Sequence, residues 1–336
     1  MKRNKRSTYK QDLKNKQKYY TKLDIFLSRM ASILKMPTGV VKGLFSERAI
    51  TTIRLNNLLQ KPDLTLNQLK TMGAEVEKVE WLDSTYTVNN MDKSDLAKTQ
   101  LYKQGFFYIQ NLSSMIPAAV LDPKSNEVVL DMCAAPGSKT SQMASMLNNK
   151  GEIVANDVDR FRAGKLIEIL HMFNVKNVKV RSEGGEGIGK REEGHYDKIL
   201  LDAPCSGEGL VYLRGEKPLR FWNIKKVKPM VATQKKLIES AFQALKKGGV
   251  LVYSTCTLEP EENEGVVTHL LAKYKNAEIE EAELFNREEF KQDEKNIKRG
   301  IRDWNNVQYF PDVSKTYRVI PSGKMMGFYI AKIVKK

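Results

Sequence analysis

Apolar and polar residues alternate along the first third of the chain with the periods of short helices and strands. Apolar side chains recur at helical spacing over residues 23–34. β-branched or alternating runs then predict strands over residues 49–56, 76–82 and 86–89. A further run at helical spacing predicts a helix over residues 64–72. Together they predict a small α+β unit that ends near residue 95.

Beyond residue 100 the pattern becomes a regular alternation of strand and helix. Strands are predicted over residues 127–132, 152–156, 178–180, 196–201 and 250–254, helices over residues 113–121, 139–147, 160–173, 233–245 and 263–274, and a closing hairpin over residues 317–319 and 327–334. Such alternation is typical of βαβ units, so we expect a Rossmann-like, mostly parallel, doubly wound sheet. Ligands of these sheets bind beyond the carboxyl ends of the strands.

The charge is uneven along the 336 residues. Lys and Arg exceed Asp and Glu by 56 to 40, a net charge of +16, and this excess predicts a polyanionic partner, nucleic acid before an anionic membrane. Residues 1–22 carry nine bases and one acid, and residues 259–294 carry 12 acids and four bases. We therefore expect a basic arm over 1–22, an α+β RNA-binding domain over 23–100 and a catalytic domain over 101–336.

Several classes of protein are excluded by composition. No apolar run reaches the roughly 18 residues that a membrane span needs, and no apolar stretch follows the basic N-terminus as in a secretory signal. Three cysteines make a disulfide framework improbable, and three histidines without a CxxC pair leave little for a metal site. We expect a cytoplasmic, metal-free, monomeric protein without a membrane partner.

The first predicted βα turn carries a loop of small residues between a strand and a helix. Small side chains let backbone N–H groups approach a ligand, and the helix start favours negative charge such as a carboxylate. The loop matches neither GxGxxG nor the Walker A pattern, which disfavours dinucleotides, ATP and hence a dehydrogenase. Its residues are Cys133, Ala134, Ala135, Pro136, Gly137, Ser138 and Lys139.

Acidic residues end the next two strands. Asp157 ends the second strand, where an acid can accept hydrogen bonds from ribose hydroxyls. Glu183 follows the third strand and is a candidate for the adenine side, although a solvated loop acid is nearly as good an interpretation. With the small-residue loop, these positions indicate an adenosine-containing ligand.

Two cysteines follow the fourth and fifth strands. Cys205 lies three residues after Asp202, and Cys256 lies directly beyond the strand of residues 250–254. These strands are neighbours in a doubly wound sheet, so both thiols and Asp202 are expected to share one cleft. Isolated cysteines in a reducing compartment are usually buried and inert, but two at adjacent strand ends favour chemistry.

A basic and aromatic segment leaves the strand of Asp202. Residues 214–236 hold eight bases and one acid, with Phe221 and Trp222 interleaved. This composition suits phosphate contacts and base stacking, and Arg214, Arg220 and Trp222 are the expected RNA contacts. The alternative is a solvated helix face with a buried Trp222.

These motifs resemble the signatures of the RsmB/NOP/Sun-type RNA cytosine-5 methyltransferases. The resemblance rests on CAAPGSKT, DAPCSGEG and YSTCTLEPEENE, in order, and extends from about Arg54 to the C-terminus. Residues 107–114 resemble the motif upstream of the catalytic core, Ile53–Asn56 the RxN element of the RNA-binding unit, and residues 327–332 the closing strand. The fold so implied is a class I methyltransferase sheet behind a small N-terminal RNA-binding domain.

The resemblance also implies roles for these residues. Cys256 is the implied nucleophile that adds to cytosine C6, Cys205 assists removal of the C5 proton and release of the enzyme, and Asp202 contacts N3. The Cys133–Lys139 loop would hold the methionine end of S-adenosylmethionine with Asp202 nearby, Asp157 the ribose and Glu183 the adenine side. Arg54 and Asn56 would contact RNA, either ribosomal RNA, which we favour by analogy, or transfer RNA.

Three further expectations follow. Ser138 stands where the family usually has a second glycine, and we expect it to cap the helix; Glu183 stands where the family usually has Asp. The acids after Cys256, Glu259 to Glu264, are expected in the first turn of the next helix. The alternative function is a non-catalytic RNA-binding assembly factor, but such a protein is expected to lack a site residue.

Overall fold

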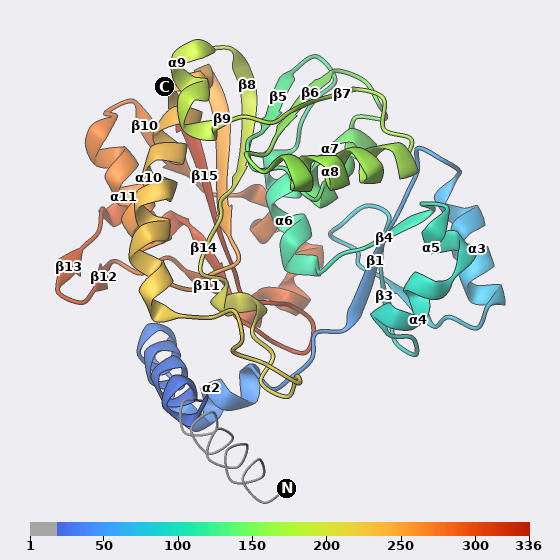
Figure 1. Cartoon of the computed structure of the whole chain (residues 1–336), viewed down its shortest axis with the longest axis horizontal. Helices are drawn as coiled ribbons and strands as arrows, with labels where there is room; N and C mark the ends of the chain where they lie inside the picture. The colour runs from blue at the N-terminus through green and yellow to red at the C-terminus, as the bar shows by residue number, and fades with distance from the viewer. Residues whose placement is uncertain (1–18) are drawn as a thin grey trace, which may run out of the picture.

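The computed structural model describes residues 19–336 (Figure 1). The predicted basic arm over residues 1–22 therefore lies outside the described residues except for its last four, which begin a helix over residues 19–34. Within the part of the chain that the structure describes, no helix has the length and apolarity needed to cross a bilayer.

A four-stranded antiparallel sheet forms the core of the N-terminal unit. Its strands lie in the order β2 (Val76–Lys78), β3 (Thr85–Val88), β1 (Thr51–Leu55) and β4 (Phe107–Ile109), with helices α3 (Pro62–Thr71), α4 (Lys93–Lys98) and α5 (Gln100–Lys103). Ile53, Leu55, Leu69 and Phe107 are buried together in its core. The predicted strands and helix are present, although β2 ends at Lys78 rather than at residue 82, and α4 and α5 were not predicted.

The boundary of this unit differs from the prediction. No strand was predicted over residues 107–109, which lie beyond the predicted boundary at residue 100, but Ile53 and Leu55 of β1 pair with Ile109 and Phe107 of β4. The unit therefore extends through about residue 109. A three-residue strand carries no periodic signal of its own, because only its partner strand determines which sheet it joins.

The helix over residues 19–34 and α2 (Thr38–Leu44) do not join the N-terminal sheet. Phe26 and Met30 of the first helix are buried with Leu219, Trp222 and Leu258 of the larger, C-terminal unit. In Figure 1 the helix, drawn in blue, lies below α10 and the loop that precedes it. The predicted domain over residues 23–100 thus consists of two separate packing units.

The larger, C-terminal unit, expected from the sequence to be the catalytic domain, is built on a nine-stranded mixed sheet. Five parallel strands lie in the order β7 (Val178–Arg181), β6 (Glu152–Asn156), β5 (Val128–Asp131), β8 (Tyr196–Asp202) and β9 (Leu245–Thr255). β15 (Phe328–Lys335) continues the sheet antiparallel to β9 and pairs on its other edge with β14 (Tyr317–Val319) and β10 (Ala277–Glu280); β11 (Ile297–Arg299) pairs with β14. The doubly wound sheet and the closing hairpin are confirmed.

Helices cover both faces of this sheet. They are α6 (Leu112–Leu121), α7 (Ser138–Met146), α8 (Arg160–Met172), α9 (Ile188–Arg191), α10 (Val227–Ala244) and α11 (Glu264–Lys273). Successive residues of β8 face opposite sides of the sheet. Leu200 is buried with residues of α6 and α7, whereas Ile199 and Leu201 are buried with residues of α10 and α11. This alternation is the side-chain period of a strand covered on both sides.

The junction between α10 and β9 lies earlier than predicted. α10 begins at Val227 rather than near residue 233, and it ends at Ala244, so that β9 already includes Gly248 with a φ of +78°. The remaining short elements are η1 (Gly185–Gly187), η2 (Glu208–Leu210), η3 (Ile224–Lys226), η4 (Glu283–Asn286), η5 (Glu288–Asn296), η6 (Pro311–Lys315), β12 (Asp303–Trp304) and β13 (Val307–Gln308).

Candidate active site

A cavity of about 350 Å³ lies at the carboxyl ends of β5, β8 and β9. Asp131 at the end of β5, Asp202 at the end of β8 and Cys256 just beyond β9 line it together. Parallel neighbouring strands end at the same edge of a sheet, and the pairing of Asp202 with Ser254 brings the last two ends together. The cavity thus brings together Asp202 and Cys256, two of the three residues expected to share one cleft.

The two cysteines predicted to meet are in contact. The Sγ atoms of Cys205 and Cys256 lie 3.0 Å apart, and both residues are half-buried free thiols. The hydrogen bond with Cys256, followed by burial, raises the pKa of Cys205 well above its usual value. Cys205 therefore keeps its proton at neutral pH, and either sulfur can be the donor of the hydrogen bond between them.

Asp202 is held between two side chains at the same edge. Its Oδ1 accepts a hydrogen bond from Ser254 Oγ at 2.8 Å, and its Oδ2 lies 2.6 Å from Lys139 Nζ. Lys139 also donates to Ser114 Oγ at 3.0 Å. The carboxylate is thus oriented by the cofactor-type loop on one side and by β9 on the other.

The small-residue loop between β5 and α7 forms one wall of the cavity. Cys133, Ala134, Ala135, Pro136, Ser138 and Lys139 all line it. Gly137 has a φ of +108°, and a Cβ at this position would lie 2.9 Å from Leu166 Cδ1, so only glycine fits the turn. Burial raises the pKa of the Cys133 thiol, which is consistent with a packing residue rather than a nucleophile.

Ser138 does not cap α7 as predicted. The N-cap position of the helix is Gly137, and no side chain among the described residues caps the first turn. Its N–H groups are consequently free for a ligand at the cavity wall. The Ser138 carbonyl instead accepts a hydrogen bond from Arg54.

Two buried carboxylates lie beside the loop. Burial raises the pKa of Asp131 to about 7, and its Oδ1 has no partner among the described residues although Oδ2 accepts from Thr140. Asp157 Oδ2 accepts from the Ala135 N–H at 3.2 Å and lies 3.3 Å from Arg162 Nη1. Asp157 thereby holds the loop in place, and its partner Arg162 lines the cavity.

Glu183 is not among the residues that line the cavity. Its carboxylate lies 2.6 Å from Arg191 Nη2 and 3.9 Å from Arg181 Nη1. Its backbone N–H donates to Asn156 Oδ1 at 3.1 Å, which keeps this segment next to the end of β6.

Several lining residues were missed by sequence reasoning. Asn111 and Ser114 come from the start of α6, Leu210 from η2, and Met326 and Phe328 from the closing hairpin. Asn111 and Ser114 belong to a motif already noted, and their polar side chains were an available signal. Met326 and Phe328 approach only through the pairing of β15 with β9, about 70 residues apart in sequence.

Three of the five predicted RNA contacts are buried. Arg54 is 4% exposed, Asn56 is 1% exposed and donates to the carbonyls of Gly105 and Phe173, and Trp222 is 3% exposed and donates to Glu208 Oε1 at 2.6 Å. Direct RNA contact by these three side chains is inconsistent with the structure, which gives them interior partners. Arg214 and Arg220 are exposed, as the prediction requires.

Of the acids after Cys256, Glu264 lies in the first turn of the next helix as predicted, whereas Glu259 and Glu262 precede the helix and are buried. Only Glu264 lies within α11, where it pairs with Arg318 at 2.5 Å. Glu259 pairs with Arg29 of the first helix at 2.5 Å. Glu262 accepts hydrogen bonds from Ser206 and from Gln234 Nε2, the latter at 2.7 Å. The expectation of a shared first turn was wrong, because these carboxylates tie the segment beyond β9 to other elements.

No group of three or more His, Cys, Asp or Glu side chains is arranged to hold a metal ion within residues 19–336. The cavity is lined by the carboxylates of Asp131 and Asp202, by Lys139 and by the Cys256 thiol, whereas Cys205 is not among its lining residues and reaches it through its contact with Cys256.

Comparison with known proteins identifies a family. Residues 118–334 match the family described as 16S rRNA methyltransferase RsmB/F. A tRNA (cytosine(49)-C(5))-methyltransferase of Pyrococcus abyssi is 46% identical over 235 residues, covering 70% of this chain and 72% of that protein. A ribosomal RNA small subunit methyltransferase F of Aeromonas salmonicida is 38% identical and covers 76% of this chain, which spans only 55% of that relative.

Solved structures agree over most of the chain. A methyltransferase homolog protein from Pyrococcus horikoshii superposes with a TM-score of 0.73 at 31% identity, covering 88% of this chain and 89% of that one. NSun6 from Pyrococcus horikoshii, solved with SFG, gives a TM-score of 0.70 at 25% identity and covers 89% of this chain and 94% of that one.

Proposed function

The chain belongs to the RsmB/F methyltransferase family, and from this premise we propose that it is an S-adenosylmethionine-dependent RNA cytosine-5 methyltransferase with Cys256 as its nucleophile. The observation that carries the proposal is the pair of thiols, 3.0 Å apart, at the edge of a cavity lined by Asp202 and the small-residue loop. Two thiols suit this reaction, because one can add to the base as a nucleophile and the other can remove a proton.

The residues of the cavity fit S-adenosylmethionine. The uncapped first turn of α7 and Lys139 suit the carboxylate of the methionine end, and the unpartnered Asp131 Oδ1 suits its ammonium group. Asp157 at the end of β6 suits the ribose. A role for Glu183 on the adenine side has less support, because its carboxylate is paired with Arg191.

Covalent attack by Cys256 activates the base. Cytosine C5 is a poor nucleophile, but a thiolate that bonds to C6 moves the electron pair of the C5–C6 double bond toward C5. Asp202, held by Ser254 and Lys139, would contact the N3 side of the ring as negative charge develops there. S-adenosylmethionine supplies, when bound, the electrophilic methyl group.

Release of the enzyme requires the second thiol. The C5 proton must leave, the pair of the C5–H bond restores the C5–C6 double bond, and Cys256 departs from C6 as a thiolate. Cys205 would first release its own proton to solvent and would then accept the C5 proton as a thiolate. The 3.0 Å separation of the sulfurs supports this division, because C5 and C6 are adjacent ring atoms. The raised pKa of Cys205 supports the proposal that this thiol is protonated before Cys256 attacks the base.

The RNA is proposed to be ribosomal or transfer RNA. The family description favours 16S rRNA, whereas the Pyrococcus abyssi relative, which this chain spans over 72% of its length, favours tRNA. A target base in a loop is preferred, because extruding a base from a duplex costs a few kcal/mol. The reaction needs reduced thiols, which supports a cytoplasmic location.

Substitution of each cysteine tests the proposal. The purified chain is incubated with labelled S-adenosylmethionine and either small-subunit rRNA or tRNA, and 5-methylcytosine is mapped by bisulfite sequencing. We expect Cys256→Ala to abolish methyl transfer and Cys205→Ala to accumulate a covalent enzyme–RNA adduct that persists in a denaturing gel.

Full methyl transfer by Cys256→Ala would contradict the nucleophile assignment. RNA binding by the wild-type chain without any transfer to either RNA would favour the alternative of a non-catalytic assembly factor.

A further inference from the structure

Arg54 is a buried cation without an acidic partner among the described residues. Its side chain, on β1 of the N-terminal unit, is 4% exposed, and no salt bridge within residues 19–336 involves it. Nη2 donates to Ser141 Oγ at 2.8 Å and to the Ser138 carbonyl at 3.3 Å, and Nε lies 3.4 Å from Gln110 Oε1. Nη1 has no hydrogen-bond partner in the same part of the chain.

Such a group is costly to bury. Charged side chains in protein interiors are normally paired, and an uncompensated charge destabilises the fold by several kcal/mol. Burial lowers the pKa of Arg54 to about 10, so the guanidinium still carries its charge at neutral pH. Its aromatic neighbour is the Tyr108 ring, whose centroid lies 5.8 Å from Cζ. Retention of this charge points to a function that a neutral residue would not supply.

The contacts of the Arg54 guanidinium indicate what its charge does. Both backbone and side-chain partners of Nη2 belong to the first turn of α7, and Ser138 and Lys139 of the same turn line the 350 Å³ cavity. The start of a helix already carries a partial positive charge. Arg54 adds a full charge behind it, on the side away from the cavity.

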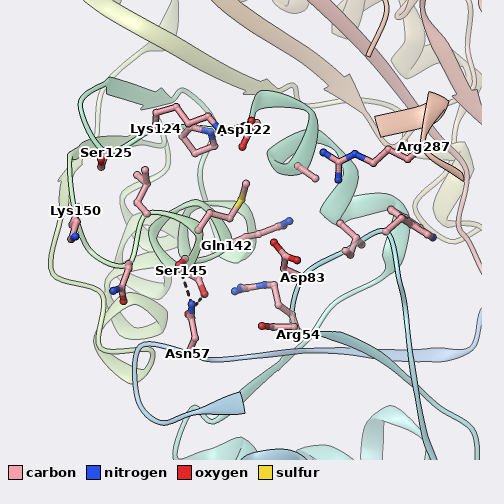
Figure 2. A pocket seen from close by; sticks show the side chains of 18 of the residues that line it. Arg54, Asn57, Asp83, Asp122, Lys124, Ser125, Gln142, Ser145, Lys150 and Arg287 are labelled. Carbon is pink, nitrogen blue, oxygen red and sulfur yellow. Dashed lines mark hydrogen bonds and ion pairs between the residues drawn. The ribbon is translucent and has the colours of Figure 1, made fainter. Parts of the chain in front are cut away.

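Figure 2 shows a second cavity, at the junction between the N-terminal unit and α7. Arg54 reaches from the N-terminal unit toward α7 next to Gln142, and Asn57 meets Ser145 one helix end away, in a separate cavity of about 510 Å³. Asn57 Nδ2 donates to the Ser145 carbonyl at 3.2 Å, and Ser145 Oγ donates to Asn57 Oδ1. The N-terminal unit therefore holds both ends of α7, but only the Arg54 end borders the cofactor loop.

We propose that Arg54 is a positioning residue that fixes the first turn of α7 and supplies positive charge behind it, so that the N-terminal unit completes the site for the carboxylate of S-adenosylmethionine. This role rests on the proposed function, since it assigns the cofactor to the Cys133–Lys139 loop. It also reassigns the RxN arginine from RNA contact to cofactor binding.

Calorimetric binding to the full chain tests this role with two ligands that differ in one carboxylate. S-adenosylmethionine and its decarboxylated analogue are titrated into the wild type, Arg54→Gln and Asn57→Ala. We expect Arg54→Gln to weaken S-adenosylmethionine about tenfold, which is about 1.4 kcal/mol, and to change the analogue less than about twofold. Asn57→Ala, which loosens the other end of α7, should change neither ligand by more than about twofold.

Equal weakening of both ligands by Arg54→Gln would show a merely structural role, and unchanged affinities would show none; either result overturns the inference. If Arg54→Gln does not fold, Ser141→Ala removes the strongest acceptor of Nη2 while keeping the charge in the protein. This variant should again weaken S-adenosylmethionine more than the analogue, and equal effects would overturn the inference. A wild-type chain that binds neither ligand would instead contradict the proposed cofactor site itself.

Discussion

At the scale of single residues, position rather than residue type distinguishes the two cysteines. Cys205 and Cys256 contact each other, yet Cys205 has its pKa raised first by the hydrogen bond with Cys256 and then by burial. The carboxylates of Glu262 and Asp202 act in the same direction. A base with a raised pKa is strong but rarely ionised, which suits a late proton-removal step better than initial attack.

The rate of adduct release should therefore increase with pH. Once Cys256 is bonded to C6, its hydrogen bond no longer acts on Cys205, but burial and the two carboxylates still raise the pKa of Cys205. Below that pKa, the thiolate fraction and hence the release rate should rise about tenfold per pH unit. Decay of the covalent enzyme–RNA adduct in a single turnover, followed on denaturing gels from about pH 6.5 to 8.5, measures it. A pH-independent decay would contradict Cys205 as the base.

The sequence predicted which chemical groups form the site better than it predicted which side chains are exposed to solvent. Cys205 and Cys256 are in contact, as expected, and Asp202 and Cys256 line one cavity, because the parallel sheet determines where β8 and β9 end. Arg54 and Trp222 were predicted at an RNA surface because arginine and tryptophan are common there. Both side chains are buried against distant parts of the chain, since Arg54 donates to the Ser138 carbonyl and Trp222 donates to Glu208. No local sequence pattern reveals such partners.

At the scale of elements, the segment beyond β9 is anchored by buried carboxylates. Glu262 is fully buried and accepts hydrogen bonds from Ser206, which directly follows Cys205, and from Gln234 of α10. Glu208 in turn accepts from Trp222 at 2.6 Å. The two cysteine-bearing loops are thus joined behind the thiols by carboxylates rather than by apolar packing alone.

This network should make stability depend on pH. Burial, partly offset by hydrogen bonds from Ser206 and Gln234, raises the pKa of Glu262 from 4.5 to about 7. Below pH 4.5 the group is protonated in both the folded and unfolded chains; between 4.5 and about 7 only the unfolded chain releases the proton. The contribution of Glu262 to the free energy of unfolding thus falls by about 1.4 kcal/mol per pH unit as pH rises through this window.

The variant Glu262→Gln should be free of that loss. We expect the free energy of unfolding of the variant, relative to wild type, to rise by a few kcal/mol between about pH 4.5 and 7.5, as measured by urea denaturation. Glu280→Gln is the matched control: burial alone would raise the pKa of Glu280, but hydrogen bonds from Lys332 and Lys336 lower it. Its relative stability should fall slightly, not rise, with pH. A parallel response of both variants would contradict the assignment.

The elements themselves were predictable where the pattern was local. The parallel strands β5 to β9 and helices α7, α8 and α11 agree with the expected ranges to within a few residues, except that β9 begins about five residues early. β4, β10 and β11 were assigned elsewhere or missed because short edge strands are determined by their partners. The early start of α10 at Val227 was missed because Pro229 suggests a break, although proline is tolerated in a first helical turn.

At the scale of the whole molecule, three separate parts of the chain support the active site or the basic segment. The N-terminal sheet holds α7 through Arg54 and Asn57. The first helix supports the basic segment, because Phe26 lies 5.2 Å from the Trp222 ring. The closing hairpin contributes Phe328. Burial of Trp222 therefore leaves its neighbours on a fixed surface: Phe221 is 76% exposed beside Arg220.

This surface accounts for RNA binding better than net charge does. Arg214, Lys217 and Arg220 are exposed, and none forms an ion pair within residues 19–336. Lysines elsewhere differ, since Lys179, Lys273 and Lys336 are each paired with a glutamate. Cations already neutralised by a neighbouring carboxylate attract a polyanion less than unpaired ones, so equal losses of formal charge should have unequal effects.

Replacement of Arg214, Lys217 and Arg220 by serine should weaken RNA binding and its salt dependence together. For each phosphate that the variant no longer neutralises, the slope of log K against log[salt] should become shallower by about 0.7 to 0.9. The control is a triple serine variant at Lys179, Lys273 and Lys336, which removes the same formal charge. Fluorescence anisotropy with a labelled RNA from about 50 to 300 mM salt measures both variants. Equal slopes would mean that RNA responds only to the overall charge, whereas a reduced slope in the first variant alone locates the contact beside the Asp202–Cys205 strand end.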